Sequence, residues 1–235
     1  MVSQARTRRL VHLVLVSALA WLVVLAARPG PQSVAAVQQS ATDPQSVSSV
    51  GQAVGWPPSA SLLVSEVVTG GTSASDEFVE IYNASSVDLD LAGLELVYVS
   101  SSGATVTRKQ SWTQQVMPAR RHLLLANSAG LWAAAADGLY SGGLSASGGS
   151  LVLRWLDGSV VDSLSWGDAA NSFVEGHAGP APSAGTSLER NPGGAAGNAT
   201  DTNDTQLDTH VESNPIGHAL VAAPMPAVTP SPTLT

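Results

Sequence analysis

Acidic and amide side chains between residues 201 and 208 are the best candidates for chemistry in this sequence. The members of this acidic cluster are Asp201, Asn203, Asp204 and Asp208. Oxygen ligands at this density could hold Ca²⁺, but their spacing does not fit an EF-hand and the glycine of that loop is missing. Because Asp and Asn also form turns by bonding their own backbone, we expect a structural turn here, with calcium binding as the alternative.

The histidines and serines lack the spacing of known catalytic motifs. Beyond His12, the histidines are His122, His177, His210 and His218, and none belongs to an H-E-x-x-H pair. His122 adjoins an apolar run and is expected at a strand edge. The segment 143–147 misses the G-x-S-x-G nucleophile elbow by one residue and is typical of a turn. We therefore expect no catalytic, cofactor-binding or metal-binding residues and no cofactor.

Three glutamates, Glu66, Glu77 and Glu80, lie on or beside apolar stretches that favour strands. Paired carboxylates can perform acid–base chemistry on glycosides. Here their alternation with apolar neighbours instead predicts that they face solvent and pair with arginines. The arginines expected to pair with them are Arg120, Arg121 and Arg154.

Tryptophan side chains could either fill a core or form a platform on which a sugar ring stacks. Those in the central part of the chain are Trp112, Trp132, Trp155 and Trp166. Trp155 alternates with Leu151 and Leu153, which favours the core. Trp112 lies in a polar segment and is the best candidate for an exposed ring.

Short strands separated by turns are expected to position these residues. They are predicted at 61–68, 77–82, 93–99, 105–109, 123–126, 151–156 and 159–164, and a short helix is predicted within 128–137. Asp157-Gly158 between the last two strands predicts a hairpin with a two-residue turn of positive φ. Strands at this spacing indicate an all-β sandwich.

Composition and charge limit the kind of protein. The chain of 235 residues has no cysteine, which excludes disulfides and thiolate chemistry. Its net charge of −8 argues against a nucleic-acid surface. The charged fraction of 12% is about half the usual content of a soluble domain, so a charge-driven disordered chain or a coiled coil is not expected.

The amino terminus has the layout of a targeting segment. Arg6, Arg8 and Arg9 precede an apolar run over 10–27, so residues 1–36 are interpreted as a signal peptide or an uncleaved membrane anchor helix. Cleavage after Ala36 is favoured, and cleavage after Ala27 is the alternative. We expect a flexible linker at 37–59, one β-sandwich domain at 60–218 and a Pro-rich disordered tail at 219–235.

Six segments occur in an order that resembles a known family. They are Leu63–Val67, Asp76–Asn83, Val87–Leu94, Leu151–Asp162, Ser187–Pro192 and Asp201–Asp204. Over about residues 61–218 this order resembles the lamin tail domain. The resemblance implies an immunoglobulin-like β-sandwich, which in bacteria is an accessory part of exported proteins, sometimes beside nucleases or phosphatases. No heptad run is present, so a role in nuclear filaments is not implied.

Together these observations predict an exported, non-catalytic β-sandwich module with a structural or binding role. We expect it to be secreted or at the cell surface, anchored in the membrane only if residues 1–36 are not cleaved. Its partner would be a protein or a cell-surface polymer, bound through loops and sheet edges. The alternatives are a part of, or accessory to, a hydrolase or phosphoesterase that uses the acidic loops, and a carbohydrate-binding module that uses Trp112.

Overall fold

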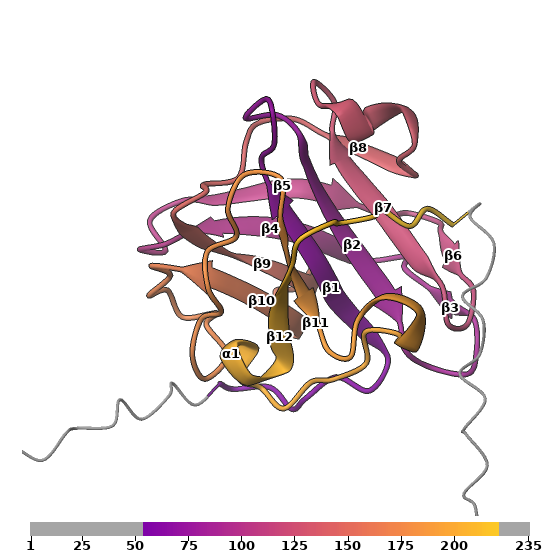
Figure 1. Cartoon of the computed structure of the whole chain (residues 1–235). Helices are drawn as coiled ribbons and strands as arrows, with labels where there is room; N and C mark the ends of the chain where they lie inside the picture. The colour runs from indigo at the N-terminus through magenta and orange to yellow at the C-terminus, as the bar shows by residue number, and fades with distance from the viewer. Residues whose placement is uncertain (1–53, 221–235) are drawn as a thin grey trace, which may run out of the picture. The chain divides into compact units, whose positions relative to one another are not determined.

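The computed structural model describes residues 54–220. The predicted leader at 1–36, residues 37–53 of the predicted linker and residues 221–235 of the predicted tail lie outside this range. The described elements (Figure 1) are β1 (Leu62–Thr69), β2 (Glu77–Asn83), β3 (Leu89–Asp90), β4 (Leu94–Ser100), β5 (Val106–Ser111), β6 (Val116–Met117), β7 (His122–Asn127), the 3₁₀ turn η1 (Leu131–Ala134), β8 (Gly138–Tyr140), β9 (Gly148–Trp155), β10 (Val160–Gly167), β11 (Ser187–Arg190), the 3₁₀ turn η2 (Gly194–Ala196), α1 (Thr205–Asp208) and β12 (Thr209–Glu212). No helix within 54–220 has the length and apolar character needed to cross a membrane.

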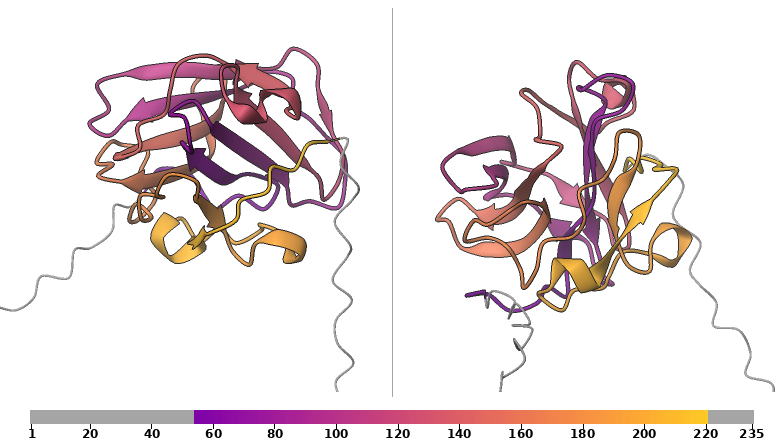
Figure 2. Two further views of the ribbon diagram at one scale, coloured as in Figure 1. Left: turned by 45° about the horizontal axis from the view of Figure 1, so that its top comes forward. Right: turned by 60° about the vertical axis from the view of Figure 1, so that its left-hand side comes forward.

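The strands form two main sheets that face each other (Figure 2). One sheet has six strands in the order β12-β11-β1-β2-β7-β8, and the other has four in the order β10-β9-β4-β5. Strands β3 and β6 form a short separate pair. Pairing in the main sheets is antiparallel except between β7 and β8. The prediction of an all-β fold is confirmed.

The core lies between the two sheets and follows from the alternation of side chains along each strand. On β4, Leu94, Leu96 and Tyr98 point into this core, as the sequence predicts. The six-stranded sheet contributes apolar side chains from every central strand to the same core, among them Val64, Ile81, Leu125 and Leu188.

Two tryptophans have environments opposite to those predicted. Trp112 is only 8% exposed and belongs to the core, because its backbone N–H donates to the carbonyl oxygen of Leu94 and continues the β4–β5 pairing. Trp155 is 44% exposed, because it is the last residue of β9, where the strand ends at the hairpin. The exposed aromatic candidate is therefore Trp155 and not Trp112.

The predicted hairpin joins β9 to β10, but its turn is longer than predicted. The N–H of Trp155 donates to the carbonyl of Ser159, and the N–H of Gly158 donates to the carbonyl of Trp155, each at 2.9 Å. The loop therefore has three residues, 156–158, and Gly158 adopts a φ of 92°. A type I turn followed by a glycine of positive φ accounts for this geometry.

Both ends of the described range contact the sandwich. The indole N–H of Trp56 donates to Glu175 at 2.9 Å, and the amide of Asn203 donates to the Trp56 carbonyl at 2.6 Å. At the other end, the N–H of Leu220 donates to Asp137 at 2.9 Å. The segment 213–220 crosses the outer face of the six-stranded sheet (Figure 1).

Candidate functional site

Three carboxylates form a row across the outer face of the six-stranded sheet. Glu66 on β1 is directly opposite Glu80 on β2 and Glu189 on β11. All three are buried, with exposures of 2%, 1% and 5%. Adjacent like charges destabilise a sheet, so this row needs compensation from other groups.

The prediction that Glu66 and Glu80 face solvent and pair with arginines is wrong. Their side chains do alternate away from the core, but segment 213–220 lies over that face of the sheet. The described side chains that face the Glu80 carboxylate are two histidines. The alternation along β1 and β2 identifies the face correctly but gives no indication of the covering segment.

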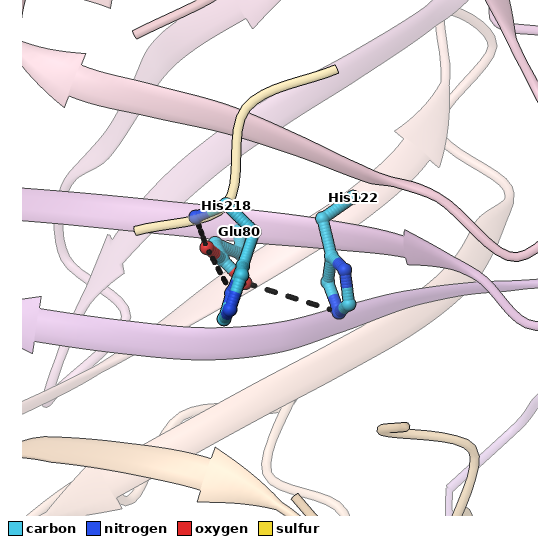
Figure 3. A group of neighbouring side chains, drawn as sticks. All are labelled: Glu80, His122 and His218. Carbon is cyan, nitrogen blue, oxygen red and sulfur yellow. Dashed lines mark hydrogen bonds and ion pairs between the residues drawn. The ribbon is translucent and has the colours of Figure 1, made fainter. Parts of the chain in front are cut away.

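Glu80, His122 and His218 come together at one end of the row (Figure 3). Nδ1 of His218 is 3.2 Å from one carboxylate oxygen of Glu80, and Nε2 of His122 is 3.9 Å from the other. The backbone N–H of His218 also donates to Glu80. The three residues belong to β2, β7 and segment 213–220, so the fold unites positions that the sequence separates by 138 residues.

His122 is held in place from two sides. Its ring stacks on Tyr82 with centroids 4.5 Å apart, and its Nε2 is 2.8 Å from the Asn198 amide oxygen. Burial lowers the pKa of His122, against the opposing effect of the Glu80 charge. The hydrogen bond with Glu80 raises the pKa of His218. His122 is the first residue of β7, so it lies at the end of a strand as predicted, and it is buried.

The other end of the row carries a second group, Glu189, His210 and Glu212. Nε2 of His210 is 3.4 Å from Glu189, and His210 is the cross-strand neighbour of Glu189 on β12. The other oxygen of Glu189 accepts from the backbone N–H of Gly194 at 2.7 Å and the amide of Asn198 at 2.9 Å. Asn198 therefore contacts both groups.

Glu66 lies between these two groups and has an incomplete set of contacts. Its Oε1 is buried without a hydrogen bond of standard geometry, and the nearby Ser187 hydroxyl opposes the rise of its pKa. Burial and the neighbouring carboxylates of Glu80, Glu189 and Glu212 raise the pKa of Glu66 to about 9. Glu66 is thus protonated at neutral pH, which relieves the repulsion along the row.

A groove of about 410 Å³ opens beside the row. Its lining consists of Glu66, Glu189, Gly194, Glu212, Asn214, Ile216 and His218. Carboxyl and imidazole groups from both ends of the row reach this one space. We call it the carboxylate groove; converging acids and imidazoles of this kind can bind a cation or move protons.

Glu77 lies apart from the groove and is also buried, contrary to the solvent-facing prediction. Its two oxygens accept from the Asn127 amide at 2.8 Å and the backbone N–H of Leu144 at 2.6 Å. Burial raises the pKa of Glu77, although both hydrogen bonds and Lys109 oppose the shift. These contacts give Glu77 a structural role between β2 and the loop that contains Leu144.

The acidic cluster at 201–208 surrounds a buried arginine. Asp201 and Asp208 lie 3.6 and 3.5 Å from Nη1 of Arg190, whose side chain is fully buried. Nη2 of Arg190 also donates to Asp162 at 2.7 Å and contacts Glu175 at 3.4 Å. The guanidinium thus supplies a positive charge to these carboxylates, which supports the structural interpretation of the cluster.

The other members of the cluster have local contacts. Asp204 is 2.8 Å from Nδ1 of His177, and the backbone N–H of Asn203 donates to Asp201 at 3.0 Å. The latter bond is the Asx-type turn that the sequence predicts.

Apart from these polar sites, the β9–β10 hairpin presents an exposed apolar tip. Trp155 and Leu156 are 44% and 58% exposed. The tip is held by hydrogen bonds, including one from the Leu156 N–H to the Gly93 carbonyl at 2.9 Å and one from the Ser159 N–H to Asp157 at 2.9 Å. We call Trp155 and Leu156 the hairpin tip.

Residues 57–168 match the family model of the Lamin Tail Domain. The chain contains a lamin tail domain. The match includes Glu66 and Glu80 of the row and the neighbouring His122, whereas Glu189, His210 and His218 follow the matched segment. A crystal structure of a DUF4876 family protein from Bacteroides thetaiotaomicron is similar, with a TM-score of 0.50 and 13% identity over 67% of this chain and 72% of that chain. At this identity the likeness concerns the fold; no curated protein matches the chain.

The carboxylate groove of this lamin tail domain has no local signature in the sequence. The histidines at the two ends of the row come from β7, β12 and segment 213–220, and no local spacing links them. One signal was present, since Glu66 and Glu80 occupy strands that are otherwise strongly apolar. A charged side chain in such a strand is either buried against a group that pairs with it or required for function.

Proposed function

We propose that this lamin tail domain is an immunoglobulin-like, non-catalytic module of an exported protein, with a binding role at the cell surface or outside the cell. The apolar run behind Arg6, Arg8 and Arg9 supports export. The facing sheets and the family match support a module whose loops are presented by a rigid core.

The exposed hairpin tip is the observation that carries the binding role. An aromatic ring presented on a hydrogen-bonded loop loses little conformational freedom when a partner covers it. The ring of Trp155 rests against Gly93, where a side chain would approach it to 3.6 Å. The tip therefore offers a preformed apolar contact, suited to a protein partner or to the face of a sugar ring in a cell-surface polymer.

Co-sedimentation of the purified full chain with washed cell envelopes tests this proposal. We expect saturable binding that Leu156→Ala and Trp155→Ala each weaken at least fivefold. Leu207→Ala is the matched control, because Leu207 on α1 is 71% exposed but outside the tip. Equal binding by all variants would remove the hairpin tip from the proposal. Competition by soluble polysaccharide would assign the partner to carbohydrate.

The location is tested separately. The protein should be recovered from the envelope or the medium, and N-terminal sequencing should find Val37 if cleavage follows Ala36. An intact amino terminus in the membrane fraction would indicate an anchor, and recovery from the cytosol would contradict export.

A metal-assisted hydrolase or phosphoesterase is the second candidate, and the carboxylate groove favours it. Paired acids and imidazoles can activate water when a cation is present. Hydrolysis of generic phosphodiester or glycoside substrates by the full chain, lost in Glu80→Gln, would replace the non-catalytic proposal with this one.

A further inference from the structure

We propose that Glu80, His122 and His218 form a binding site for a divalent transition-metal ion, with zinc as its best representative. This site goes beyond the proposed binding role, which uses the hairpin tip. The groups concerned are one carboxylate and two imidazole nitrogens, the ligand types that zinc accepts in His₂Glu sites.

The separations of the ligand atoms fit such an ion. A tetrahedral zinc ion bound at about 2.0–2.1 Å separates its ligand atoms by about 3.3 Å. Nδ1 of His218 and Nε2 of His122 lie 3.2 and 3.9 Å from the two Glu80 oxygens, and one ligand atom from each residue lies within 4.8 Å of the others. The His218 side chain is 26% exposed, so its ring can adjust while the two buried ligands stay in place.

The surroundings hold the ligands before any ion arrives. Tyr82 stacks on the His122 ring, and the backbone N–H of His218 bonds Glu80. The Asn198 amide oxygen lies 2.8 Å from Nε2 of His122, the same nitrogen that would bind the ion. When the ion displaces the proton of Nε2, this oxygen is placed to become an additional neutral ligand.

A second observation, independent of the three ligands, also points to a cation. Glu66 on the neighbouring strand lines the carboxylate groove, and its buried Oε1 lacks a hydrogen bond of standard geometry, with the Ser187 hydroxyl as its side-chain neighbour. Glu80 itself is only 1% exposed, and a buried carboxylate is stabilised by positive charge close to it. An ion at Glu80 supplies that charge, and the groove gives it a path to solvent through the exposed side of His218.

The donor set selects the class of metal. Imidazole nitrogen suits Zn²⁺, Cu²⁺, Ni²⁺ and Fe²⁺, whereas Ca²⁺ and Mg²⁺ prefer sites built from oxygen alone. We therefore expect zinc to bind and calcium not to bind at the same concentration.

Calorimetric titration of ZnCl₂ into the chelator-stripped full chain, purified without a histidine tag, tests the site. The expected result is one ion per chain with a Kd of 10 µM or tighter, and a weakening of at least 100-fold in Glu80→Gln and in His218→Gln. His177→Gln is the matched control, since His177 contacts Asp204 outside the site, and it should bind zinc as the wild type does. Circular dichroism of each variant separates loss of ligand from loss of fold.

Three results would overturn the site. They are the absence of zinc binding to the folded wild type, unchanged binding in folded Glu80→Gln and His218→Gln, and loss of binding in His210→Gln but not in His218→Gln. The last result would move the ion to the group of Glu189, His210 and Glu212. Envelope binding through the hairpin tip is measured in a separate experiment. A failure of zinc binding therefore leaves the proposed binding role untouched, and a failure of envelope binding leaves the zinc site untouched.

Discussion

The guanidinium of Arg190 shows how single residues hold this fold together. It bonds the carbonyl of Val64 on β1 and the carboxylate of Asp162 on β10, which belong to opposite sheets. Burial raises the pKa of Asp162, although the charge of Arg190 opposes the shift. One arginine faces four carboxylates, so part of the negative charge must be neutralised by protons.

Removing this guanidinium should be costly. Arg190→Met leaves several buried carboxylates without their cation and should lower the free energy of unfolding by about 3–5 kcal/mol. Arg108→Met is the matched control, because its side chain is 58% exposed in the pair with Glu95, and it should cost less than about 1 kcal/mol. Urea unfolding measures both; similar losses in the two variants would contradict the structural role of Arg190.

Glu175 should make stability depend on pH. Burial raises its pKa from 4.5 to about 7 in the folded chain, against the opposing effect of Arg190. Because the unfolded carboxyl ionises at lower pH, the contribution of Glu175 to stability is present below about 4.5 and is lost as pH rises through about 7. Between pH 5 and 8 the wild type should lose roughly 2–3 kcal/mol relative to Glu175→Gln. Urea unfolding at each pH measures the difference. If the free energies of unfolding of the wild type and Glu175→Gln change in parallel with pH, the predicted role of Glu175 is wrong.

Among the elements, the strands were predictable where alternation dominates. The seven strands expected from the sequence all occur, and β4 has the predicted faces. Strands β11 and β12 were not predicted, because they have four residues each, mostly polar, and are strands through their pairing in the sheet that contains β1. The predicted exposures of Trp112 and Trp155 are wrong for a related reason. Both residues lie at or next to strand ends, where pairing with neighbouring strands and not alternation determines whether a side chain is buried.

The β9–β10 hairpin gives a test at the scale of one element. Gly158→Val should lower stability by about 1–2 kcal/mol, since valine resists the φ of 92° at a position where no neighbour lies within 4 Å of an added side chain. Gly55→Val is the control, because it is equally open but does not have a positive φ, and it should change stability by less than about 0.5 kcal/mol. Equal melting temperatures for the two variants would mean that the loop adopts another turn.

At the scale of the whole molecule, segment 213–220 covers the outer face of the six-stranded sheet and determines which groups contact its carboxylates. It places His218 on Glu80, and Gly217 packs so closely that an added side chain would come within 3.0 Å of Leu124. The carboxylate groove could not be predicted from the sequence because this covering is a tertiary contact between distant segments. Its chemistry therefore belongs to the complete fold and not to a local motif.

Truncation tests this covering. A variant that ends at Asn214 uncovers Leu124 and the edge-to-face pair of Phe78 and Trp132, and it should lose about 2 kcal/mol or more of stability. A variant that ends at Leu220 retains the segment and should match the full chain within about 0.5 kcal/mol. Thermal unfolding compares the two; equal melting temperatures would show that the segment contributes no stabilising contact.

We propose that this lamin tail domain binds its partner without altering it. The most direct measurement is mass spectrometry of the envelope component captured by the full chain, after prolonged incubation with zinc. We expect the component to be recovered chemically intact and its capture to be reduced by Trp155→Ala. Cleavage of the component by the wild type, abolished in folded Glu80→Gln, would contradict the claim.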